Sequence, residues 1–202
     1  MHASPQAPRR RPPARQLILA AAARVFARDG LEGATTRAIS REAGVNEVTL
    51  FRHFGTKERL IEAVVGSAFG AKPARRPAPA QARRPLREDL ALFAERYERL
   101  LEENLPLIRT MIGEIHRHAV CQRQALRGIF SPMREALVER LAAARRTGET
   151  RADLNPALAA DLLAGMIFSS VIRRASLPRR SEYDAAEYRR ECLNVFIGGL
   201  GT

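Results

Sequence analysis

Cysteine and long apolar runs are both scarce in this chain. Of its 202 residues only Cys121 and Cys192 are thiols, far apart and without a Cys-x-x-Cys spacing. One disulfide between them is an alternative, but isolated thiols are more typical of buried residues in a reduced cytoplasmic protein. No apolar run approaches the roughly 20 residues of a membrane span, and the basic N-terminus leads into no signal-peptide core. We therefore expect a cytoplasmic protein with no membrane partner.

Motifs of enzyme chemistry are also missing. The sequence has no Gly-rich phosphate loop, no nucleophile elbow and no paired metal motif. Its dense polar cluster is Glu114, His116 and His118, within an expected helix. Residues 114 and 118 share a helical face while His116 points away, so the three side chains cannot converge on one metal ion. A site of two ligands completed from another helix is the remaining alternative. We therefore expect that the protein is not an enzyme and that it has no catalytic residues, no metal site and no cofactor.

Strand patterns are lacking, and acidic residues are few in the N-terminal part. No segment alternates apolar and polar residues, whereas apolar residues recur at helical spacing, which predicts an all-α protein. Residues 1–85 hold 16 Lys and Arg against 6 Asp and Glu, while residues 86–202 hold 18 against 16. The N-terminal part is therefore expected to bind a polyanion, of which nucleic acid is the obvious one.

Residues 35–60 predict two short helices around a tight turn, followed by the start of a third helix. Thr36 is the predicted N-cap of the first, and Gly44 ends it in a conformation that is cheap without a Cβ. Asn46 is suited to cap the second helix. Leu50 and Phe54, four residues apart, face the core. The residues left on other faces of that helix are Glu47, Val48, Thr49, Arg52 and His53. Caps, turn and burial pattern together indicate a helix-turn-helix.

Composition divides the chain into parts. Residues 1–14 are predicted to be a disordered basic arm, which either touches DNA or only aids solubility. Residues 15–70 hold the helix-turn-helix domain, with a first helix that ends at Gly30 and a connecting helix capped by Thr56. Residues 71–85 contain four prolines and five cations and predict a linker. Residues 86–202 predict a helical domain, in which Asn155-Pro156 marks a helix start and Pro132 a kink.

The chain resembles a known family in three stretches of residues 15–69, which are A-A-x-x-V-F-A-R-D-G, T-T-R-A-I-S-R-E-A-G-V and T-L-F-R-H-F-G-T-K-E-R-L. These resemble the DNA-binding domain of the TetR/AcrR-type bacterial transcriptional regulators. The resemblance implies an N-terminal three-helix DNA-binding domain, a connecting helix and a C-terminal helical bundle for ligand binding and dimerisation. It further implies a homodimeric repressor that binds double-stranded DNA at a palindromic operator and responds to a small-molecule effector of unknown identity.

The resemblance places DNA contacts on the two short helices and just beyond them. It assigns Thr36 and Arg37 to backbone phosphate. Base edges in the major groove are assigned to Glu47, Val48 and Thr49. Phe51 replaces the family's usual Tyr, which removes one phosphate hydrogen bond. Glu47 either accepts a hydrogen bond from a cytosine N4 or is a first-turn acid that suits the helix dipole. The complete set is Thr36, Arg37, Asn46, Glu47, Val48, Thr49, Phe51, Arg52, His53 and Lys57.

Two surfaces are expected in the helical domain. The helix from Leu158 to Ile172 has small residues on one side and large apolar residues on another, so we expect it to serve both the core and a dimer interface. The predicted ligand pocket, whose members are each alternatively plain core residues, is Phe93, Tyr97, Met111, Ile115, His116, Phe130, Met133 and Met166. The predicted dimer interface is Leu158, Leu162, Met166, Ile167, Val171, Tyr188 and Val195.

Two other classes of protein remain open. A nonspecific nucleic-acid-binding protein would use the basic arm and the linker, and it would lose binding when residues 1–14 are deleted. A helical small-molecule-binding module would bind its ligand with no dependence on DNA.

Overall fold

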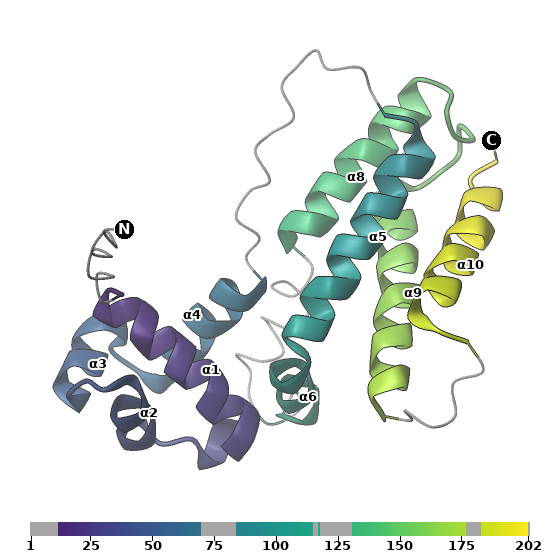
Figure 1. The fold of residues 1–202 in the computed structure, drawn as a ribbon. Coiled ribbons are helices and arrows are strands. Elements are labelled where there is room, and N and C mark those ends of the chain that lie inside the picture. Colours follow the sequence, from purple (N-terminus) through teal and green to yellow (C-terminus); the bar gives the residue numbers. More distant parts are fainter. Residues whose placement is uncertain (1–11, 70–83, 115–116, 118–130, 177–182, 202) are drawn as a thin grey trace, which may run out of the picture. The chain divides into compact units, whose positions relative to one another are not determined.

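A computed structural model of the chain describes residues 12–69, 84–114, 117, 131–176 and 183–201. The regular elements in these ranges are all α-helices (Figure 1), which confirms the all-α class. The backbone divides into two compact units, residues 1–67 and residues 68–202. Most of the predicted arm and linker lies outside the described residues, as do His118 and Cys121.

The N-terminal unit is built on α1 (Ala14–Gly33), which is interrupted near its end. Gly30 has φ 74° and ψ 173°, a conformation that favours glycine, so the regular helix stops where the sequence predicts. After the break Leu31 returns to the core and is 1% exposed. The helix buries one apolar stripe, consisting of Ile18, Leu19, Ala21, Ala22, Val25 and Phe26.

The helix-turn-helix consists of α2 (Thr36–Ala43) and α3 (Glu47–Phe54). The predicted N-cap of α2 is wrong by one residue, because the Thr35 side chain accepts from the Ala38 amide at 3.1 Å. Thr35 has the extended backbone that a cap requires, whereas Thr36 is already helical. Gly44 closes α2 at φ 65°, and Asn46 accepts from the Val48 amide at 2.9 Å, both as predicted.

The connecting helix α4 (Lys57–Phe69) begins at the predicted cap. The Thr56 hydroxyl accepts from the Arg59 amide at 3.2 Å. The inward residues of α2, α3 and α4 complete the apolar interior with α1, and they include Ile39, Ala43, Leu50, Phe54, Leu60, Ile61 and Val64. The two short helices are thus held by burial of their apolar sides rather than by their length.

The second unit contains α5 (Leu86–Glu103), α6 (Leu105–Glu114), α8 (Ser131–Arg146), α9 (Pro156–Ser176) and α10 (Ala185–Gly198). Helix α9 lies against α5, α8 and α10 (Figure 1). Asn155 caps α9 as predicted, since its side chain accepts from the amides of Ala157 and Leu158 at 3.1 and 3.2 Å. Pro132 is the second residue of α8, and the residues before this helix, where a kink was expected to begin, lie outside the described ones.

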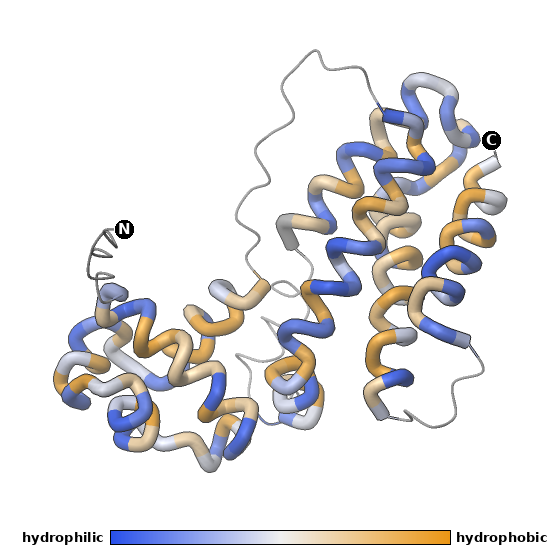
Figure 2. The backbone as a smooth tube through the Cα atoms, viewed as in Figure 1, coloured by the Kyte–Doolittle hydropathy of each residue, from blue (hydrophilic) through white to orange (hydrophobic). Residues whose placement is uncertain are grey.

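Helix α9 is unusually apolar. Figure 2 colours it orange or pale along most of its length, whereas α5 carries blue and orange turns in alternation. Among the described residues it is the helix whose length and composition would permit a membrane span, a property that core helices of soluble proteins share. Only 39% of its most apolar stretch is buried, so much of this helix faces outward in a single chain.

A buried carboxylate links three helices of this unit. Glu98 on α5 has only 5% of its side chain exposed. It accepts a hydrogen bond from Arg174 of α9 at 2.8 Å and another from Arg189 of α10. Arg174 also reaches Glu102 at 2.8 Å. Burial of a charge is tolerated here because two guanidinium groups compensate it.

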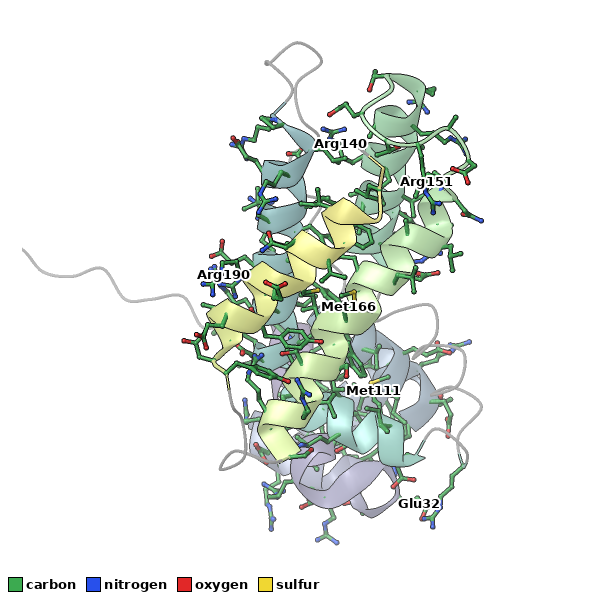
Figure 3. The ribbon with its side chains drawn as sticks, turned by 90° about the vertical axis from the view of Figure 1, so that its right-hand side faces the viewer. Glu32, Met111, Arg140, Arg151, Met166 and Arg190 are labelled. Carbon is green, nitrogen blue, oxygen red and sulfur yellow. The ribbon has the colours of Figure 1, made fainter. Side chains whose placement is uncertain are left out.

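Two further arginines tie α8 to its neighbours. Arg140, labelled in Figure 3, donates to Asp89 on α5 at 2.6 Å and to Glu149 at 3.0 Å. Arg134 donates two hydrogen bonds to Asp161 on α9, at 2.6 and 2.9 Å. These bonds hold the pKa of the Asp161 carboxyl below its usual range. Helices that also share an apolar core are thereby fixed in register by polar contacts.

Candidate nucleic-acid interface

Helix α3 presents two kinds of apolar residue. Leu50 and Phe54 are buried, with 0% and 6% exposed, and fasten the helix to the scaffold. Val48 is 71% exposed and Phe51 45% exposed on the other side. Large apolar side chains on the outside of a short polar helix have no role in its own folding, so they are available to a partner. Apolar contact with a thymine methyl is one use of such residues in a major groove.

The ten residues predicted to contact DNA are all accessible. Arg37, Asn46, Val48, Phe51, Arg52 and His53 are exposed, and Thr36, Glu47, Thr49 and Lys57 are half-buried. They occupy α2, the N-cap and the residues of α3, and the first residue of α4. Asn46 has a second role, because its side chain is also the cap of α3.

Thr36 and Glu47, eleven positions apart in sequence, are brought together by the turn between α2 and α3. The Thr36 hydroxyl donates a hydrogen bond to Glu47 Oε1. Each residue is the first of its helix, so the bond joins the two helix N-termini. From the sequence, Thr36 was predicted to contact phosphate and Glu47 to contact base edges, with no contact expected between the two.

A surface hollow of about 510 Å³ lies between α2 and the start of α3, and Glu47 is one of its lining residues. Arg37 and Arg41 of α2 and Glu47 of α3 supply its charged groups. Ser40 also lines it, and the buried Ser40 hydroxyl has no partner within the described part of the chain. Arg41 was not predicted as a site residue, although its position four residues after Arg37 places both on one helical face.

The cations of this unit differ in how they are used. Arg24 and Arg28 of α1 both bond to Glu42 of α2, and this pairing, with Arg24 the main cause, keeps the pKa of the Glu42 carboxyl below its usual range. Within the described residues, no ion pair engages Arg37, Arg41 or Arg52. Arg24 and Arg28 are thus neutralised by carboxylates, while the three arginines of the helix-turn-helix remain available to an anion.

Lys57 and His53 complete the predicted set. The Lys57 ammonium donates to the Glu32 carbonyl at 3.3 Å, which occupies one of its three N–H groups and ties α4 to the end of α1. The His53 ring lies beside that of Phe54, with centroids 6.2 Å apart. Both residues keep polar atoms free for an outside partner.

The predicted ligand pocket is described only in part. Tyr97 and Met111 are fully buried, with 1% and 0% exposed, and the rings of Phe93 and Tyr97 stack at 5.5 Å. Met133 and Met166 are half-buried, and Met166 is labelled on α9 in Figure 3. The remaining predicted members, Ile115, His116 and Phe130, lie outside the described residues.

The predicted dimer surface separates into two groups. Leu158, Leu162 and Val195 are 57%, 56% and 61% exposed, which is unusual for side chains of this kind. Met166 and Tyr188 are half-buried. Ile167 and Val171, in contrast, are core residues, 1% and 2% exposed, and have no surface to offer to a partner. The reason is helical geometry, because they lie on the opposite side of α9 from the two leucines.

Comparison with known families gives two matches along the chain. The model of bacterial regulatory proteins of the tetR family matches residues 18–64. The model of the tetracyclin repressor-like C-terminal domain matches residues 82–186, which is more than half of the chain. The first match covers the helix-turn-helix, and the second covers most of the helical unit.

Individual relatives agree with these matches. The transcriptional regulator UidR of Escherichia coli is 25% identical over 197 residues, with 94% of each chain covered. The repressor AcnR of Corynebacterium glutamicum is 46% identical over 50 residues, 25% of this chain and 27% of AcnR. The fold is shared with FadR of Bacillus subtilis in complex with stearoyl-CoA, at a TM-score of 0.74 and 22% identity over 91% of this chain and 98% of that one. The fold is also shared with GusR of Salmonella enterica, at a TM-score of 0.69 and 22% identity. That match covers 93% of this chain and 95% of the GusR chain. The chain belongs to the tetR family of bacterial regulatory proteins and is a helix-turn-helix, DNA-binding transcription regulator.

Proposed function

We propose that this regulator is a ligand-responsive repressor that binds a palindromic operator as a homodimer. The observation that carries the proposal is the surface around α3, where exposed Val48 and Phe51 lie among cations without ion-pair partners in the described residues. Cations without internal partners attract the phosphate backbone, and side chains of α3 reach base edges in a major groove.

Two-fold symmetry is supported by the helical unit. Leu158, Leu162 and Val195 expose more than half of their surface in a single chain, and such residues are typical of protein interfaces. A dimer through this face would present two copies of α3 to successive major grooves, about 34–36 Å apart. A palindromic operator is the DNA that matches this symmetry.

Control by a small molecule is supported by the relatives. The FadR structure contains stearoyl-CoA, and AcnR is named a repressor. We propose that an effector bound within residues 86–202 lowers operator affinity through residues 15–70, with a coupling of about 1–3 kcal/mol. Such a regulator acts in the cytoplasm, where its operator is.

Titration of the full-length protein against labelled DNA from upstream of its own gene tests this proposal. We expect sequence-selective binding that outcompetes random DNA and weakens as salt is raised. Arg52→Ala should weaken operator binding roughly tenfold, because one phosphate or base contact is lost. Arg190→Ala, which removes the same charge from the exposed surface of α10 (Figure 3), should leave binding unchanged. Absence of a selective complex with any DNA would overturn the proposal.

The charge excess of residues 1–85 supports a second candidate, a nonspecific nucleic-acid-binding protein. Deletion of residues 1–14 separates the two. A repressor without its arm should keep its preferred sequence and lose only part of its affinity. A nonspecific binder should lose nearly all binding, and Arg52→Ala should then have little effect.

A further inference from the structure

The hydrogen bond between Thr36 and Glu47 restricts what each side chain can do. A threonine hydroxyl has one proton, and here that proton is donated to Glu47 Oε1. The Thr36 hydroxyl therefore has no proton left to donate to a DNA phosphate. At the N-terminus of α2, a phosphate would instead be bound by Arg37, by Arg41 and by the free N–H groups of the first helical turn.

Glu47 keeps one acceptor oxygen available. Its carboxylate bonds to Thr36 through Oε1, and no other hydrogen bond or ion pair engages it within the described residues. A free glutamate side chain loses rotamer freedom when it binds, and Thr36 has already removed part of that freedom. The remaining oxygen is thus fixed in place before DNA arrives.

The surroundings of Glu47 make an acid acceptable against a polyanion. Arg37 and Arg41 line the same hollow as Glu47, so two positive charges share one surface with its negative charge. The N-terminus of α3, where Glu47 is the first residue, adds a favourable dipole. These groups reduce the repulsion between the carboxylate and nearby phosphates.

The chemistry of a fixed carboxylate oxygen selects one base. In the major groove guanine presents two acceptors and thymine presents an acceptor and a methyl group, all unfavourable for an acceptor. Adenine presents a donor beside the N7 acceptor, which repels a carboxylate. Cytosine presents its N4 amine, a donor that a carboxylate accepts from.

We propose that Thr36 is a positioning residue for base recognition, which holds the Glu47 carboxylate so that it selects cytosine at one position of each operator half-site. This inference rests on the proposed function, because it requires α3 to enter the major groove. Glu47 contacts the base, and Thr36 acts only through Glu47.

Selection from a pool of randomised oligonucleotides by the full-length protein, followed by sequencing, tests the proposal. The wild type should prefer cytosine by at least about fivefold at one position per half-site. Glu47→Gln should change the preferred base at that position to adenine, because a glutamine amide pairs with adenine N6 and N7. Thr36→Val should reduce the preference to within about twofold, and Thr36→Ser, which keeps the hydroxyl, should restore it.

The controls separate positioning from folding. Thr35, not Thr36, caps α2, so Thr36→Val should retain the wild-type helical content by circular dichroism. If this variant does not fold, the change from cytosine to adenine in Glu47→Gln still decides whether Glu47 reads a base. The inference is wrong if folded Thr36→Val keeps the cytosine preference, or if no position of the selected sequence changes in Glu47→Gln. In either case, selection of a defined operator by the wild type would still support the proposed function. If the wild type selects no sequence at all, the proposed function itself is contradicted.

Discussion

Glu98 of α5 and Arg174 of α9 form a 2.8 Å ion pair in which the carboxylate is almost completely enclosed. Removing the carboxylate deprives Arg189 of its ion-pair partner and leaves Arg174 paired with Glu102 alone. We expect Glu98→Ala to lower the free energy of unfolding by about 3 kcal/mol, as loss of one partner of a buried pair does. The matched control is Glu95→Ala, which breaks an exposed pair with Arg99 on the same helix and should cost less than about 0.5 kcal/mol. Urea titration followed by circular dichroism measures both values, and equal effects would contradict the prediction.

Charge on the apolar face of α9 should prevent assembly. We expect the double variant Leu158→Glu and Leu162→Glu to reduce the mass in solution from that of two chains to that of one, because like charges would meet across the two-fold axis. Ile112→Glu is the control, since Ile112 on α6 is also an exposed apolar residue, at 46%. Light scattering after gel filtration measures the mass. If the double leucine variant remains a dimer, or if Ile112→Glu also dissociates, the prediction that this face of α9 forms the interface is contradicted.

The thiol of Cys192 should be unreactive in the folded protein. Burial raises its pKa from 9.0 to about 11. At pH 8 this shift lowers the thiolate fraction about a hundredfold, so reaction with a thiol reagent should slow by at least that factor relative to the chain in denaturant. A Cys121→Ser background leaves one thiol to report.

The same shift has a consequence for stability. The proton is held more tightly in the folded state, so the contribution of Cys192 is fully present below pH 9 and is lost as pH rises through 11. In the Cys121→Ser background, a further Cys192→Ala change should flatten the decline of the unfolding free energy between pH 9 and 11. Identical pH profiles with and without Cys192 would contradict this assignment.

Thr35 should carry the cap energy of α2. Thr35→Ala removes the oxygen that accepts from Ala38, and we expect it to lower the free energy of unfolding by about 1 kcal/mol. Thr35→Ser retains the oxygen and should be close to the wild type. Thermal unfolding of the two variants measures the difference, and an equal loss in both would show that the methyl group rather than the oxygen matters.

The local parts of this fold could be predicted because their causes are local. Gly44, Asn46 and Asn155 each act within a few residues of chain, and each occupies the predicted place. The prediction of the N-cap of α2 was wrong by one residue, because Thr35 and Thr36 have the same side chain. Only the backbone conformation, extended at Thr35, decides which of them caps.

The polar contacts between distant residues could not be predicted. Glu98 and Arg174 are separated by 76 positions, and a glutamate within a helical stripe gives no sign that arginines from two other helices will enclose it. The bond from Thr36 to Glu47 depends on the angle of a turn, which the sequence of that turn does not specify. The exposed α9 face could be predicted because apolar residues cover more of this helix than one core requires. The sequence did not show that the side with Ile167 faces the core and the side with Leu158 faces outward.

The outward leucines of α9 also bear on how operator occupancy depends on the amount of protein. If two chains must join through this face before a two-fold operator is filled, occupancy at low expression rises with the square of the chain concentration rather than in proportion to it. A modest change in synthesis or degradation would then alter transcription steeply. Single chains would also expose an adhesive apolar surface until they meet, which favours their removal by proteolysis and keeps the unassembled pool small.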